Sequence, residues 1–311
     1  MSCSINARPY LTFHQSNVMA ELRRQSTGIP ELDERLGGGL LAGTLTVVMG
    51  ATGIGKTQLG LAYADAGLKQ EGHRGVLFDM SYRGDAQFHA EYAERMFDWK
   101  LESFEPRSSG DPAYFAADWK PGEYLHVFDA RGRRLNPWDL EFDAYRDRKQ
   151  QIVEKLQSTI AFFYAHFSRQ VRRAVVDGVD PADRPSESLQ FELFDYVYHQ
   201  ILRKDSDWVA RDLLRQDFRR LAELVEQHRY EQSQIGGMLL YTSHETLLEP
   251  LIERPLVEGD WLANANTIIY LGKIRNGTKL TRALYIPKHR GSYVSDEIIP
   301  YEIGAEGLKL L

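Results

Sequence analysis

The sequence predicts an α/β fold in which a mainly parallel β-sheet is flanked by helices and ends in a β-hairpin at its C-terminal edge. Three observations predict it. A glycine-rich loop, residues 50–57, joins an apolar run to a helical pattern. Short apolar runs then alternate with helical segments, which is typical of a parallel sheet with helical crossovers. Asn276-Gly277 lies between two β-rich segments, which is a strong hairpin signal.

Local signals place the elements of the first half of the chain. Pro30 lies in the first turn of a short helix, and the glycines at 37–39 end it. The apolar runs read as strands because they are short and bounded by turn residues. Residues 105–122 read as a loop because they are rich in Pro, Ser and Gly. The strands expected in this half are residues 44–49, 75–80 and 124–128, and the helices are 31–36, 56–70 and 86–99.

Helical periodicity dominates the middle of the chain, and strands return towards its end. One apolar face predicts an amphipathic helix over 142–170; it comprises Ile152, Leu156, Ile160, Phe163 and Phe167. Two more helices are expected at 187–203 and 208–230. The remaining strands are expected at 174–177, 238–242, 267–271 and 280–286.

Length and composition indicate one globular unit. No repeat or linker divides the 311 residues, so we expect an N-terminal arm at 1–25 and a single domain at 26–311, with an enlarged helical and loop region at about 85–170. Cys3 is the single cysteine, which excludes an intrachain disulfide and suits a reducing cytoplasm. Neither a membrane-length apolar stretch nor a secretory signal is evident.

The loop at 50–57 has the pattern G-x-x-x-x-G-K-[ST] of a phosphate-binding loop. Its glycines permit a close approach of the backbone to phosphate oxygens, Lys56 can reach the β and γ phosphates, and Thr57 can hold Mg²⁺ through its hydroxyl. Asp177 ends a buried-type strand, which is where a Mg²⁺-directed carboxylate belongs in this class. The nucleotide-binding residues predicted here are Gly50, Ala51, Thr52, Gly53, Ile54, Gly55, Lys56, Thr57 and Gln58.

Several segments together resemble the KaiC branch of the RecA-type ATPases. They are Ser26–Asp33, Gly37–Leu40, the phosphate loop, Val175–Gly178, Arg282–Ser292, Tyr301–Ile303 and Glu306–Leu308. The resemblance spans about 26–311, while 100–170 and 181–235 match only in outline. It implies a RecA-type fold, ATP and Mg²⁺ as ligands, and a homo-oligomeric, most simply hexameric, ring with a regulatory or signalling role and an unidentified regulatory protein partner.

The same resemblance raises a question about catalysis. In that family the second strand ends in paired glutamates, one of which activates water, whereas this chain has Met80-Ser81-Tyr82-Arg83 there. Asp79 lies slightly too early, Asp85 slightly too late, and Glu245 follows a neighbouring strand. Either one of these three replaces the glutamate, or hydrolysis is very slow and ATP serves as a structural switch.

The family also implies contacts to the γ-phosphate. Its K-x-R pair reaches the nucleotide of the neighbouring subunit, and Lys288 and Arg290 occupy those positions here. Two residues apart on a strand share a face, so they can act together; the alternative is an edge strand protected by charges. The Thr242 hydroxyl, at the end of the strand after Asp177, could sense the γ-phosphate.

A nucleic-acid role is the less favoured alternative. The loops that recombinases use for DNA, here 179–188 and 244–260, hold more acidic than basic residues, which repels phosphates. The net charge of −6 points the same way. Aromatic residues over 82–145, interleaved with arginines that include Arg131, Arg133 and Arg134, could stack on bases, but their spacing favours core packing.

Overall fold

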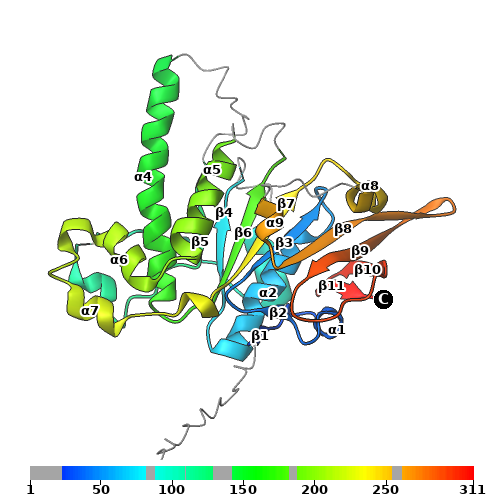
Figure 1. Ribbon diagram of the computed structural model, residues 1–311, viewed down its shortest axis with the longest axis horizontal. Helices are drawn as coiled ribbons and strands as arrows, with labels where there is room; N and C mark the ends of the chain where they lie inside the picture. The colour runs from blue at the N-terminus through cyan, green and yellow to red at the C-terminus, as the bar shows by residue number, and fades with distance from the viewer. Residues whose placement is uncertain (1–22, 82–87, 109, 129–141, 182–187, 254–260) are drawn as a thin grey trace, which may run out of the picture.

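A nine-stranded mixed sheet forms the centre of the molecule, with helices on both faces (Figure 1). The computed structural model describes residues 23–81, 88–108, 110–128, 142–181, 188–253 and 261–311. The strand order is β11-β10-β9-β8-β3-β7-β6-β4-β5. Strands β8, β3, β7, β6, β4 and β5 run parallel, and β9, β10 and β11 add an antiparallel edge. The predicted fold class is thereby confirmed.

The elements match the predicted strands closely and the predicted helices less closely. The strands are β1 Arg24–Gln25, β2 Leu40–Leu41, β3 Leu45–Gly50, β4 Val76–Asp79, β5 Tyr124–His126, β6 Arg173–Val179, β7 Gly236–Thr242, β8 Thr267–Asn276, β9 Lys279–His289, β10 Ile299–Gly304 and β11 Gly307–Leu310. The α-helices are α1 Pro30–Arg35, α2 Lys56–Glu71, α3 His89–Phe97, α4 Phe142–Phe167, α5 Leu189–Tyr196, α6 Ser206–Leu214, α7 Ala222–Gln227, α8 Leu248–Glu253 and α9 Trp261–Asn264.

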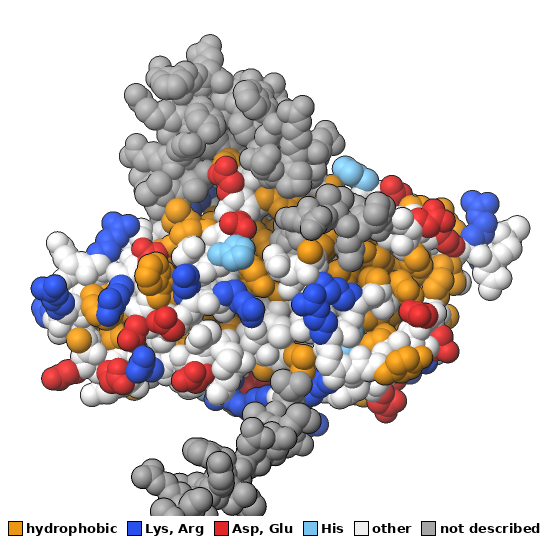
Figure 2. Space-filling view, viewed as in Figure 1, with side chains coloured by type: hydrophobic (Ala, Val, Ile, Leu, Met, Phe, Trp, Pro, Cys, Tyr) orange, Lys and Arg blue, Asp and Glu red, His pale blue; other side chains and the backbone are white. Residues whose placement is uncertain are grey.

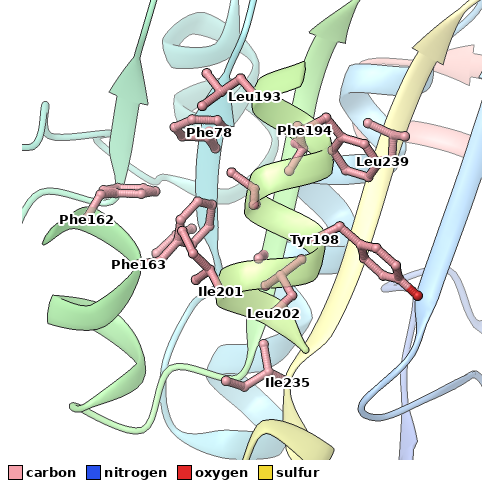
Figure 3. Close-up of a cluster of buried hydrophobic side chains, with 14 of the residues drawn as sticks. Phe78, Phe162, Phe163, Leu193, Phe194, Tyr198, Ile201, Leu202, Ile235 and Leu239 are labelled. Atoms are coloured by element: carbon pink, nitrogen blue, oxygen red, sulfur yellow. The ribbon is translucent and has the colours of Figure 1, made fainter. Parts of the chain in front are cut away.

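Alternate residues of the central strand enter different cores. Val47 and Met49 of β3 belong to a cluster that packs under α4, α5 and α6, whereas Val48 belongs to a cluster under α1 and α2. All six residues of β3 are buried, because both faces of the sheet are covered. Figure 3 shows part of the first cluster, in which Phe78 of β4 faces Phe162 and Phe163 of α4.

Three helical predictions need correction. Helix α4 is not amphipathic at its C-terminal end, since residues 159–168 are buried on all sides between the sheet and the helices beyond. The helix expected at 187–203 becomes a π-helix at Val197–Leu202. The helix expected at 208–230 ends at Leu214, where Arg215 takes φ +50, and helical structure resumes as a 3-10 turn and α7. No glycine or proline marks this break, so periodicity alone does not reveal it.

The predicted hairpin is confirmed, and the aromatic segment is largely core. Asn276 pairs with Lys279 across the turn, where Gly277 has φ +60. Tyr114, Phe115 and Trp119 are buried, and the guanidinium carbons of Arg107 and Arg169 each lie 4.8 Å from the Trp119 ring centroid. This packing accounts for these aromatics without a bound base; Arg131, Arg133 and Arg134 lie outside the described residues. Among the described helices, none is both long and apolar enough to cross a bilayer.

Candidate functional site: the phosphate loop and the strand tips around it

The phosphate loop lies where the carboxyl ends of the parallel strands meet. Strand β3 ends at Gly50 and helix α2 begins at Lys56, so the loop joins a strand to a helix, as its pattern requires. Gly53 and Gly55 adopt φ +75 and +108, which glycine tolerates and other residues resist. Thr52 and Gly53 are exposed at the top of the loop, while Ala51 and Ile54 are buried. Gln58 is buried within α2, and its Oε1 has no hydrogen-bond partner.

Lys56 is folded against its own loop. Its Nζ donates to the carbonyl oxygens of Gly50 and Ala51, each at 2.9 Å. Burial lowers the pKa of this amine, and the negative charges of Asp177 and Asp180 oppose that shift. The ammonium group is therefore already positioned at the mouth of the loop, where a phosphate would exchange for the two carbonyl oxygens.

Thr57 and Asp177 form the predicted metal-directed pair. The Thr57 hydroxyl donates to Asp177 Oδ2 at 2.8 Å, and the backbone N–H of Gly178 donates to Oδ1 at 2.7 Å. Burial by itself raises the pKa of Asp177, but hydrogen bonds from His89 and Thr57 and the charges of His89 and Lys56 together hold it below its usual value. An anionic carboxylate beside a hydroxyl supplies the oxygen ligands that Mg²⁺ prefers, so these residues fit the ion.

His89 belongs to this site, although no sequence motif indicates it. It is the first residue of α3, its side chain is 3% exposed, and its Nε2 lies 3.0 Å from Asp177 Oδ2. Its Nδ1 lies 3.8 Å from Asp79 Oδ2 and has no hydrogen-bond partner. Burial lowers the pKa of the imidazole, but the hydrogen bond and charge of Asp177, with the charges of Asp79 and Glu91, raise it overall. The available sequence signal is that this histidine lies near the start of the helix expected at 86–99.

The candidate catalytic carboxylates are not equivalent. Asp79 is fully buried and lies beside Asp177 in the β4–β6 register. Its two oxygens accept from the Ser81 backbone N–H at 2.8 Å and from the Tyr124 hydroxyl at 2.7 Å. Glu245 is exposed beyond the end of β7. Asp85 lies outside the described residues.

Thr242 lies next to the start of the loop. It pairs in register with Gly50, and the backbone N–H of Ser243 donates to the Gly50 carbonyl at 3.0 Å. The Thr242 side chain is half-buried. The Thr242 hydroxyl therefore lies at the same carboxyl end of the strands as Lys56 and Asp177.

The structure does not bring Lys288 and Arg290 to the phosphate loop of their own chain. Lys288 pairs with Ile268, which pairs with Val47, whereas Gly50 is level with Leu271. Both basic residues thus lie towards the end of the strands that is opposite the phosphate loop. The Lys288 Nζ donates to the Ala263 carbonyl at 2.7 Å, and burial and the nearby charge of Arg290 lower its pKa.

His289, between the two basic residues, faces inward. Its Nδ1 lies 2.8 Å from the Thr267 hydroxyl, and its Nε2 lies 3.1 Å from the Leu36 carbonyl oxygen. The Arg290 side chain is exposed, and its backbone N–H donates to the Asn266 carbonyl at 3.0 Å. Strand β9 ends at His289, so Arg290 lies in the turn that follows, and the strand alternation expected to pair it with Lys288 stops one residue short of it.

Comparison with known proteins gives a match that includes the loop. Residues 25–111 match the family model described as the KaiC ATPase. No curated protein matches the chain. Among solved structures, a KaiC-like protein from the archaeon Pyrococcus horikoshii OT3 is similar, with 18% identity over 93% of this chain and 99% of that one and a TM-score of 0.49. The segment with the phosphate loop therefore resembles the KaiC ATPase family, and the sheet around that loop is the mostly parallel core that this resemblance implies.

Proposed function

We propose that this protein binds ATP with Mg²⁺ between copies of itself, in a head-to-tail ring that is most simply a hexamer. In this proposal nucleotide acts mainly as an assembly switch in a regulatory or signalling role, with slow hydrolysis. The observation that carries it is the separation of Lys288 and Arg290 from the phosphate loop of their own chain.

That separation is too large for a contact within one chain. Lys288 is level with Val47, three residues before Gly50, and strands rise about 3.3 Å per residue, which gives about 10 Å before the loop begins. Lys288 is also directed at the end of α9 rather than at β3. A K-x-R pair that contacts a γ-phosphate from this position needs the phosphate of another subunit. Contacts of that kind are head-to-tail, and they close into a ring when the rotation permits.

Exposed apolar side chains support self-association. In the described C-terminal part of the chain, Leu280, Tyr293, Ile298 and Leu311 are exposed by 53%, 88%, 42% and 70%. Figure 2 shows hydrophobic side chains gathered around α8, β8 and β9 on the face it presents. Apolar patches of this kind commonly mark protein–protein interfaces. The antiparallel edge that carries Lys288 is therefore the surface we expect a neighbour to cover.

Among the described residues, the strand tips supply the two proposed metal ligands but no evident base. Thr57 and Asp177 would hold Mg²⁺, which when bound neutralises charge on the phosphates. At the end of β4, Met80 and Ser81 occupy the positions where the family has glutamates, and Asp79 already accepts from two donors. Loss of a positioned acid–base group typically lowers the rate by about 10²- to 10⁴-fold. We therefore expect slow turnover.

The first test is assembly. Sedimentation velocity of the purified protein with and without Mg-ATP should show a larger species only with nucleotide. Lys56→Ala should abolish this shift, because it removes the phosphate contact. Lys69→Ala, on the exposed face of the same helix, is the matched control and should leave the shift intact. Assembly of Lys56→Ala that equals wild type in ATP would contradict nucleotide bridging.

The second candidate function is an ordinary ATPase, in which Asp79, Asp85 or Glu245 activates water. Steady-state phosphate release at saturating Mg-ATP, with Lys56→Ala as the blank, separates the two. Release clearly above the blank would favour the ATPase, and substitution of each carboxylate would identify the base. Direct DNA binding remains the least supported role, and a salt-dependent shift of labelled single-stranded DNA would establish it.

A further inference from the structure

The carboxylate meant for the metal already has a close hydrogen-bond partner. Asp177 Oδ2 accepts from the Thr57 hydroxyl at 2.8 Å and lies 3.0 Å from His89 Nε2, while Oδ1 accepts from the Gly178 N–H. Only the threonine contact is expected of this class of site. The histidine contact is not part of the phosphate-loop pattern, and it comes from the first residue of α3.

Neighbouring groups hold the His89 ring in place. Its centroid lies 5.5 Å from that of Tyr124, whose hydroxyl is bonded to Asp79. The Tyr92 N–H donates to the Phe88 carbonyl at 3.0 Å, which closes the first turn of α3 beside the histidine. With 3% of its side chain exposed, the imidazole has little room to leave Asp177 unless α3 also shifts.

Mg²⁺ and the imidazole N–H compete for the same oxygen atom. Both interact with lone pairs of the carboxylate. Asp177 Oδ1 already accepts from the backbone N–H of Gly178, and Oδ2 accepts from the Thr57 hydroxyl. A divalent ion held by Thr57 and Asp177 would need a lone pair of Oδ2, the oxygen that Thr57 and His89 both contact. While the imidazole N–H donates to Oδ2, it occupies a lone pair that the ion or its bound water would use.

We propose that His89 is a resident hydrogen-bond donor to Asp177, and that Mg²⁺ must displace this hydrogen bond before the metal can bind. His89 thereby sets how much free Mg²⁺ the nucleotide site requires, and it is a positioning residue that acts through Asp177. This inference rests on the nucleotide binding proposed above. It adds that the site binds nucleotide in the absence of metal and binds metal only at elevated concentration.

The test measures metal demand rather than turnover. The dissociation constant of a fluorescent N-methylanthraniloyl-ATP is determined on the full chain over a range of free Mg²⁺, and the midpoint of its Mg²⁺ dependence is read out. His89→Ala should lower that midpoint by about tenfold or more, since one charge-assisted hydrogen bond no longer has to be broken. Binding of Mn²⁺, followed by electron paramagnetic resonance, should tighten in parallel. An unchanged or raised midpoint in folded His89→Ala would overturn the inference.

Two conservative variants keep the test decisive if His89→Ala does not fold. His89→Gln places an amide N–H near the position of Nε2 and should retain most of the wild-type midpoint, whereas His89→Asn places it near Nδ1 and should not. Equal midpoints for the two would also overturn the inference. His126→Gln is the control, because His126 bonds to the Ser81 carbonyl at the same strand edge without contacting Asp177. A wild-type protein that binds no nucleotide at any Mg²⁺ concentration would instead contradict the proposed function.

Discussion

The Tyr301 hydroxyl donates a hydrogen bond of 2.7 Å to the carbonyl oxygen of Ile54, so the last hairpin of the chain holds the phosphate loop. Tyr301 is 3% exposed, and burial raises its pKa. Ile303, two residues later on β10, packs against the loop as well, since a Cβ placed on Gly55 would lie 2.9 Å from its Cδ1. The β10–β11 hairpin therefore supports the loop physically.

Tyr301→Phe should weaken both the fold and the nucleotide site. It leaves the buried Ile54 carbonyl without its donor, which costs about 1 kcal/mol of the free energy of unfolding. The loop loses an anchor, so ATP affinity should fall several-fold. Urea unfolding and a nucleotide titration measure the two effects. Tyr293→Phe, at a side chain that is 88% exposed, is the matched control and should change neither.

Gly178→Ala should be costly because the segments that end β4 and β6 approach each other closely beside Asp177. Gly178 has φ +82, and a Cβ there would lie 2.3 Å from the Ser81 backbone nitrogen. The left-handed conformation alone costs about 1–2 kcal/mol for alanine, and relief of the clash should also move Asp177. We expect a lower melting temperature and weaker Mg²⁺-dependent nucleotide binding. Gly304→Ala, where nothing lies within 4 Å of the added Cβ, should be tolerated.

The sequence predicted those parts of the site whose chemistry is local. The phosphate loop, the strand before it and the helix after it lie within a few residues, so backbone requirements alone define them. Asp177 was predicted from its place at the end of a buried strand, and it does meet Thr57. The order of strands and helices likewise predicted the parallel sheet, and Asn276-Gly277 predicted the β8–β9 hairpin, whereas strands β10 and β11 beyond it were not predicted.

What the sequence left out depends on contacts between distant segments. His89 reaches Asp177 only because α3 is placed beside the tip of β6, and no spacing rule connects the two residues. The break after Leu214 results from a positive φ at Arg215, which no glycine signals. The C-terminal end of α4 is buried on all sides, because helices beyond it cover the face that would otherwise be exposed to solvent. Periodicity in the sequence cannot show that a second layer of helices covers this face.

Acid should destabilise the protein through His166. Burial lowers the pKa of this histidine from 6.5 to about 4, outweighing its backbone hydrogen bonds. Below about pH 6.5 the unfolded chain therefore binds a proton at this histidine that the native state does not bind. The contribution of His166 to the free energy of unfolding is present above about pH 6.5 and is lost as pH falls towards 4, by up to about 3 kcal/mol.

Urea unfolding at a series of pH values between 7.5 and 4 measures this loss. His166→Gln, which cannot titrate, should reduce the pH dependence over that window even if it lowers stability at pH 7.5. His199→Gln, at an exposed position, is the control. A His166→Gln profile parallel to that of wild type would show that other groups account for the loss.

Complementation between two defective proteins tests the trans contact directly. Lys56→Ala should fail to bind nucleotide, and the double variant Lys288→Ala with Arg290→Ala should bind it but release it quickly from the oligomer. In a head-to-tail ring, a Lys56→Ala subunit still offers its intact Lys288 and Arg290 to the loop of a double-variant neighbour. Mixing the two proteins should therefore slow release of a fluorescent ATP analogue severalfold relative to the double variant alone. Release from the mixture that equals the concentration-weighted sum of the separate proteins would mean that the pair does not act across the interface. A mixture of the Lys309→Ala protein with the Lys56→Ala protein is the control for mixing itself. Lys309 is exposed on β11, so the Lys309→Ala protein keeps both its phosphate loop and its basic pair intact.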